Sequence, residues 1–154
     1  MDLIAAIRPD SWNFPLLVHL IGATTLVGAL VLAGASLLFA WRDGNGGLAV
    51  VGYRTMLLAV LPAWIVMRGG AQWVASKEHV ENSNASWVGI GFSTADGGLV
   101  LLLAATLLAW LAVRRTRREG AAAPGGLGGA SAILVGVLVI AYVVAVWAMT
   151  TKPV

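Results

Sequence analysis

The stretch LVLLLAATLLAWLAVRRTRR, residues 99–118, is the strongest indication of the fold of this chain. An uncharged apolar run leads directly into four arginines, and a second long apolar run follows after a short glycine-rich segment. Arginine clusters beside an apolar span mark the cytoplasmic end of a membrane helix, because positively charged loops resist translocation. The topology markers in this stretch are Arg114, Arg115, Arg117 and Arg118.

Composition places the whole chain in the same class. Of its 154 residues, 59% are hydrophobic and 11% are charged, whereas a soluble domain has about 25% charged residues. The net charge of +3 is concentrated in the arginine cluster, and no basic face with interleaved aromatic residues is present, which argues against nucleic-acid binding. The absence of cysteine excludes disulfides and thiolate metal sites.

Four segments are long enough to cross a bilayer, which requires about 20 apolar residues. They cover residues 14–41, 48–68, 97–113 and 127–149, and Pro62 is expected to kink the second. The sequence therefore predicts a single transmembrane domain, an all-α bundle of four membrane helices.

The arginines also predict an orientation. They place the segment 114–126 in the cytoplasm, so that alternation of the spans gives an N-out, C-out protein in a bacterial cytoplasmic membrane. The segment 69–96 is then an outer loop. It holds most of the hydrogen-bonding side chains and several aromatic residues, which predicts an ordered loop.

His19 lies about five residues inside the first span, on the face that carries a stripe of small side chains. Small residues allow another helix to approach closely in lipid, so this face is predicted to pack within the bundle or against a partner. An ionisable residue at such a position has two interpretations. It is either a neutral imidazole that is hydrogen-bonded to a neighbouring group, or a functional residue that binds a ligand such as a metal or handles a proton. The predicted packing face contains Gly22, Thr25, Ala29, Ala33 and Ser36.

Arg68 and Asp96 flank the outer loop, one at the end of the second span and one at the start of the third. A carboxylate is favoured near the N-terminus of a helix, and an ion pair between these two residues would join the helix ends. Gln72 lies one turn beyond Arg68 on the same face if the helix continues through Gly69 and Gly70. The pair predicts either a salt bridge or a polar site that uses both residues.

Glu78 and His79 form, with Glu81, the only short cluster that resembles metal ligands. Imidazole and carboxylate groups suit zinc or copper. A solvated helix face is the competing interpretation, and a site that joins His79 to His19 is a further possibility because both lie on the predicted outer side. A haem would need an axial ligand from a partner subunit or a second copy, since only one histidine lies within a span.

The sequence gives no support for an enzyme. It contains no Gly-x-Ser-x-Gly elbow, P-loop or Rossmann glycine pattern, and no acidic residue lies in the interior of any span.

The segments VHLIGATTLVGAL, LPAWIVMRGGAQWVASKE and WVGIGFSTADGG resemble small bacterial membrane proteins of the DUF2269 type and, more distantly, copper-resistance D-like proteins. The resemblance implies a four-helix membrane bundle and makes His19 the position for any metal role. The multiple histidines and methionines expected of copper handling are missing from this chain.

Two functions therefore stay open. The leading hypothesis is a non-enzymatic accessory, assembly or structural component that packs as a homo-oligomer or with the subunits of a membrane complex. The alternative is an outward-facing protein that binds or transports a metal, a haem or a small ligand, using His19 with Arg68, His79 and Asp96.

Overall fold

The computed structural model describes residues 13–78, 86–119 and 125–151, and side chains within 13–77, 89–118 and 125–148. The elements are α1 (Asn13–Asp43), α2 (Gly46–Thr55), the π-helical segment η3 (Met56–Val60), α3 (Leu61–Glu78), α4 (Ser86–Glu119) and α5 (Gly125–Thr151). Because α2, η3 and α3 follow one another without a break, they form one span. The described residues thus contain four helical spans that are long and apolar enough to cross a membrane, which confirms the all-α, four-span prediction.

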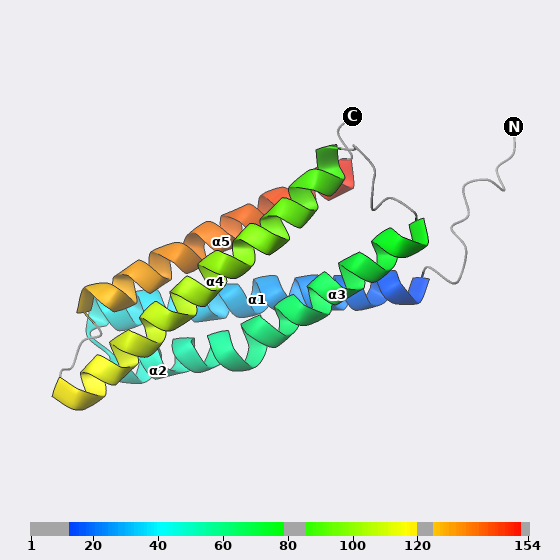
Figure 1. The fold of residues 1–154 in the computed structure, drawn as a ribbon. Coiled ribbons are helices and arrows are strands. Elements are labelled where there is room, and N and C mark those ends of the chain that lie inside the picture. The colour runs from blue at the N-terminus through cyan, green and yellow to red at the C-terminus, as the bar shows by residue number, and fades with distance from the viewer. Residues whose placement is uncertain (1–12, 79–85, 120–124, 152–154) are drawn as a thin grey trace, which may run out of the picture.

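The spans form two closely packed pairs, as Figure 1 shows. In one pair α1 lies along the α2–α3 span, and in the other α4 lies along α5. Contacts between α1 and α5 also join the pairs, whereas α3 and α4 touch at few points. The link between α3 and α4 therefore depends on individual side chains.

The core runs along the centre of the bundle and consists of fully buried apolar side chains from every span. They include Leu26, Leu30, Leu37, Met56, Val60, Leu102, Val135 and Leu138. The outer surface is equally apolar, with Leu58, Val100 and Ile140 at least 66% exposed. A large exposed apolar surface is unfavourable in water, so this surface is consistent with contact with a lipid bilayer.

The turn between α1 and α2 is built by two adjacent residues. Gly44 has a φ of 67°, a left-handed conformation that costs glycine little. The Asn45 N–H donates to Ala40 O at 3.0 Å, which completes a Schellman motif at the end of α1. The Asn45 side chain then accepts from the N–H groups of Gly47 and Leu48, at 2.9 and 3.2 Å, and so caps α2.

The second span bends at η3 (Figure 1). The Leu61 N–H donates to Met56 O, five residues back, which is the π-helical pattern. Pro62 follows directly and has no N–H to donate, so the regular α-helical pattern is interrupted at this point. The expected effect of Pro62 thus takes the form of a π-helical segment just before the proline.

The helices extend beyond the apolar runs. Their observed ends therefore differ from the span boundaries that were predicted from those runs. Residues 69–78 continue α3 through Gly69 and Gly70, and 86–96 are the first part of α4, so most of the segment expected as an outer loop is helical. The four arginines likewise lie in the last turns of α4 instead of in a loop. The length of an apolar run matches the thickness of the hydrocarbon core of the membrane. The helix itself can continue into the polar region on either side, because it depends only on its backbone hydrogen bonds.

Candidate functional site

Several polar side chains connect α3 and α4 toward one end of the bundle. Arg68 of α3 donates through Nε to Asp96 Oδ1 of α4 at 2.9 Å. Its Nη1 donates to Gln72 Oε1, one turn along α3, at 3.0 Å. The guanidinium carbon also lies 4.7 Å from the centre of the Phe92 ring. The ion pair expected between the two helix ends is therefore present, and Gln72 shares it because α3 continues through the glycines.

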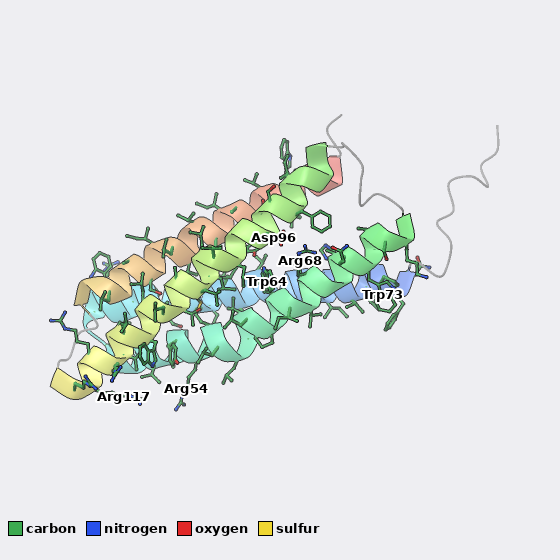
Figure 2. The ribbon with its side chains drawn as sticks, in the orientation of Figure 1. Arg54, Trp64, Arg68, Trp73, Asp96 and Arg117 are labelled. Atoms are coloured by element: carbon green, nitrogen blue, oxygen red, sulfur yellow. The ribbon has the colours of Figure 1, made fainter. Side chains whose placement is uncertain are left out.

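A second bond joins α3 to α4 one turn deeper. The indole Nε1 of Trp64 donates to Ala95 O at 3.1 Å. Trp64 and Arg68 stand four residues apart on α3 and reach two consecutive residues of α4, as Figure 2 shows. We call these two bonds, with Gln72, the polar bridge. They hold α3 and α4 together where the two helices have few other contacts.

Tyr142 of α5 lies beside the polar bridge, near Trp64 and Asp96. The residue is only 4% exposed, and its hydroxyl forms no hydrogen bond with the residues that the structure describes. The hydroxyl end of the Tyr142 ring packs against Gly98 of α4. A Cβ added to Gly98 would lie 2.7 Å from the Tyr142 hydroxyl oxygen. Sequence reasoning missed Tyr142, because a single tyrosine in an apolar span carries no motif.

His19 bonds to the backbone of α3. Its Nδ1 lies 2.9 Å from Met67 O, and since a carbonyl oxygen only accepts, Nδ1 carries the proton. The neighbouring glycines bring the two helices close enough for this bond. A Cβ on Gly22 would lie 2.7 Å from Met67 Cα, and one on Gly70 would lie 2.8 Å from His19 Cα. His19 thus forms a hydrogen bond with a neighbouring group, which is the first of the two interpretations drawn from the sequence.

The other predicted metal ligands cannot be placed around His19. His79 and the side chain of Glu78 lie outside the described residues. Within the described part of the chain, no group of three or more histidine, aspartate or glutamate residues is arranged to hold a metal ion. Asp96, another described residue of the predicted polar site, is paired with Arg68.

The small-residue stripe on α1 is divided between two environments. Gly22, Ala33 and Ser36 are buried, Ala29 is half-buried and Thr25 is exposed. The buried face is centred on the line of Leu26, Leu30 and Leu37, so it is rotated away from Thr25. Side-chain size was an incomplete guide because Leu26, Leu30 and Leu37 share the buried face with the small residues.

The buried polar residues of α4 and α5 complete the set of links between helices. Ser131 of α5 is fully buried, and its hydroxyl donates to Ala105 O of α4 at 2.8 Å. Thr106 and Ser36 instead donate to backbone carbonyls of their own helices.

No family model, curated protein or solved structure matches this chain, so the resemblance to DUF2269-type proteins stays a prediction.

Proposed function

We propose that this chain is a non-enzymatic component of a membrane assembly, which acts by packing its helices against further copies of itself or against partner subunits. One observation carries the proposal: polar side chains inside the spans are used to join helices. The bonds are His19 to Met67 O, Trp64 to Ala95 O, Ser131 to Ala105 O, and Arg68 to Asp96. Such bonds contribute about 0.6 kcal/mol each on average in membrane bundles.

The outward side of α1 offers the surface for a partner. Thr25, Gly28 and Ala35 are exposed there, and nothing lies within 4 Å of a Cβ built on Gly28. Small residues allow the backbone of another helix to approach. Large side chains project from both outer helices, among them Ile21, Leu32 and Phe39 on α1 and Ile133, Val137 and Ile140 on α5. We propose that the partner approaches α1 at the open position of Gly28.

A pair of glycine variants tests this assignment. Gly28→Leu is expected to weaken association, because a large side chain would separate the approaching helices. Gly136→Leu is the matched control, since Gly136 is also exposed and also has open space at its Cβ. Native mass spectrometry and light scattering in mild detergent measure the assembly. A monomeric wild-type chain without a stoichiometric partner, or equal effects of both variants, would overturn the proposal.

We infer an N-out, C-out orientation in a bacterial cytoplasmic membrane from the arginines at the end of α4. The chain contains no cysteine, so single-cysteine variants can be labelled without background. Lys77→Cys, at the end of α3, should react with an impermeant maleimide added outside the cell. Arg115→Cys, at the end of α4, should react only after the membrane is opened. Labelling of both from the same side would refute this orientation.

A second function is favoured by the orientation of His19. With Nδ1 donating to Met67 O, the Nε2 lone pair is available as an acceptor. Metal-ligating histidines commonly have this arrangement, in which a backbone carbonyl fixes the ring. The ligand would be a metal ion, or a haem shared with a partner subunit. Metal analysis and an optical spectrum of the purified protein decide between the functions: a stoichiometric metal or haem that is lost in His19→Ala supports the second and defeats the first.

A further inference from the structure

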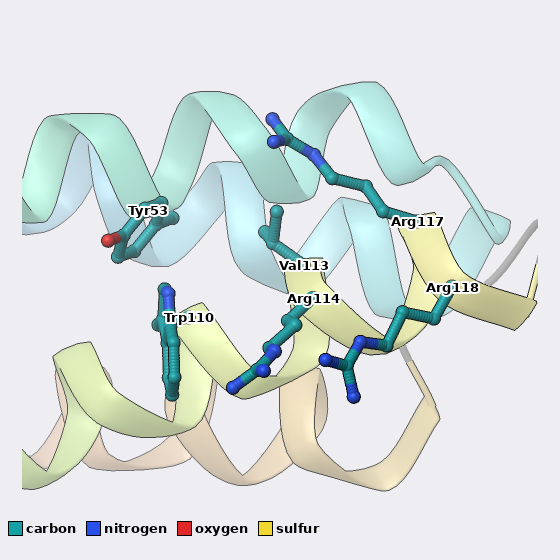
Figure 3. Close-up of a pocket in the computed structure, with 6 residues that line it drawn as sticks. All are labelled: Tyr53, Trp110, Val113, Arg114, Arg117 and Arg118. Carbon is teal, nitrogen blue, oxygen red and sulfur yellow. The ribbon is translucent and has the colours of Figure 1, made fainter.

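At the end of the bundle away from the polar bridge, a pocket of about 430 Å³ lies between α2 and the last turns of α4. Pockets of about 300–1,000 Å³ accommodate small ligands. Figure 3 shows Arg114 and Arg118 directing their guanidinium groups to the same side of α4, whereas Arg117 extends past Val113 toward α2. The lining residues are Tyr53, Trp110, Val113, Arg114, Arg117 and Arg118.

The pocket holds a concentration of positive charge. Arg114, Arg117 and Arg118 stand at positions i, i+3 and i+4, so they share one face of α4, where like charges repel. Among the side chains that the structure describes, none of the three forms an ion pair with a carboxylate. Arg114 lies instead over the Trp110 ring, 5.1 Å from its centre. An external anion would relieve this repulsion.

The chemistry of the lining favours an anion such as phosphate. Guanidinium groups bind phosphate oxygens through two parallel N–H donors, and several arginines can share one phosphate group. Tyr53 lines the opposite end of the pocket, with its hydroxyl pointing away from the arginines (Figure 3), so the guanidinium groups are the donors that an anion would meet. The lining contains no carboxylate or imidazole, so it offers no ligand set for a metal cation.

An apolar stripe leads along α4 to the arginines. Leu103, Leu107 and Trp110 are 51%, 54% and 37% exposed, and their spacing of four and then three residues puts them on one side of the helix. Arg114 follows four residues after Trp110 and continues the stripe. An acyl chain attached to the bound phosphate would lie along this stripe, whereas a free phosphate ion would make no use of it.

We propose that the pocket binds the phosphate group of an anionic phospholipid. Arg114 and Arg118, whose guanidinium groups point to the same side of α4, contact the phosphate, and an acyl chain follows the stripe of Leu103 and Leu107. Basic pockets between membrane helices bind anionic head groups elsewhere, and each basic residue near the membrane surface contributes about fivefold in affinity. The site is separate from the helix-packing role proposed above and does not depend on it.

The test uses the full chain in nanodiscs of mixed phosphatidylcholine and phosphatidylglycerol, followed by native mass spectrometry of the lipid retained after extraction into mild detergent. The wild-type chain is expected to retain phosphatidylglycerol in preference to phosphatidylcholine. Arg114→Gln combined with Arg118→Gln should weaken retention about 25-fold, from two arginines at about fivefold each. The matched control combines Arg42→Gln with Arg54→Gln, which removes the same charge outside the pocket lining. Its loss of retention should be clearly smaller than that of the pocket variant, because neither arginine lines the pocket.

Three results would overturn the proposal. They are equal retention of both lipids by the wild-type chain, equal losses in the pocket and control variants, and complete displacement of the lipid by millimolar inorganic phosphate. The last result would assign the pocket to a free phosphate ion. Circular dichroism checks that both variants are helical. If the pocket variant fails to fold, the lipid preference of the wild-type chain and its competition with inorganic phosphate still decide the question.

Discussion

At the scale of single residues, the contact between α1 and α3 depends on two glycines. Gly22 faces the backbone of Val66 and Met67, and Gly70 faces the backbone of His19. No side chain separates the helices at these points, so the His19 imidazole can reach the Met67 carbonyl across the interface. The sequence places His19 on a face with Gly22, but it does not indicate that Gly70 is the reciprocal contact.

Gly70→Ala is expected to destabilise the protein by about 1–3 kcal/mol, because the new methyl group would overlap backbone atoms that cannot move independently of their helix. Gly69→Ala is the matched control: nothing lies within 4 Å of its Cβ, and alanine favours the helix. Thermal unfolding in detergent, followed by circular dichroism, measures the difference. Equal unfolding temperatures for the two variants would contradict the close packing.

At the scale of elements, the ends of the helices are specified by local residues more than by hydropathy. The sequence Gly44-Asn45 ends one helix and starts the next within two residues, through a positive φ and a side-chain cap. The π-helical segment before Pro62 similarly follows from a missing N–H. The sequence predicted the interruption at Pro62, whereas its π-helical form and the cap at Asn45 were found only in the structure. The length of α4 beyond its apolar run could not be predicted, since helix continues outside the apolar core without a hydropathy signal.

Asn45→Ala should lower the free energy of unfolding by about 1 kcal/mol, because two N–H groups at the start of α2 lose their acceptor. Asn45→Asp retains a side-chain oxygen in the same position and should recover most of the stability. The comparison uses unfolding of both variants in the same detergent. If the aspartate variant were as unstable as the alanine variant, the cap would not be the source of the effect.

At the scale of the whole molecule, two tightly packed helix pairs are held together at one end by the polar bridge. An exposed ion pair contributes about 0–1 kcal/mol, so Arg68 and Asp96 matter more for the placement of α4 against α3 than for total stability. Removing them should change the separation of the two helices before it unfolds the protein.

Spin labels at Lys77→Cys on α3 and Ile90→Cys on α4 can report this separation. Asp96→Ala is expected to broaden and lengthen the distance distribution, because Arg68 loses its partner on α4. Arg54→Ala, at the opposite end of the second span, is the control and should leave the distribution unchanged. A distribution that is identical in wild type and Asp96→Ala would show that the ion pair does not hold the helices.

The number of spans, the helical class and the positions of the few polar residues within the spans all follow from the sequence. Insertion into a membrane depends on the composition of about 20 consecutive residues, so these properties are local. The ion pair between Arg68 and Asp96, one of the two interpretations drawn from the sequence, is present, although both residues lie well inside their helices and not at the helix ends.

The side of each helix that faces the bundle, in contrast, depends on the packing of the four spans against one another. The spans are apolar all round, with no polar face to set their rotation, and lipid gives no hydrophobic advantage to burial. For this reason Thr25 is exposed while Leu26 beside it is fully buried, and only part of the predicted packing face lies inside the bundle. The bond from Trp64 to Ala95, the burial of Tyr142 and the arginine-lined pocket likewise depend on how the helices rotate and cross.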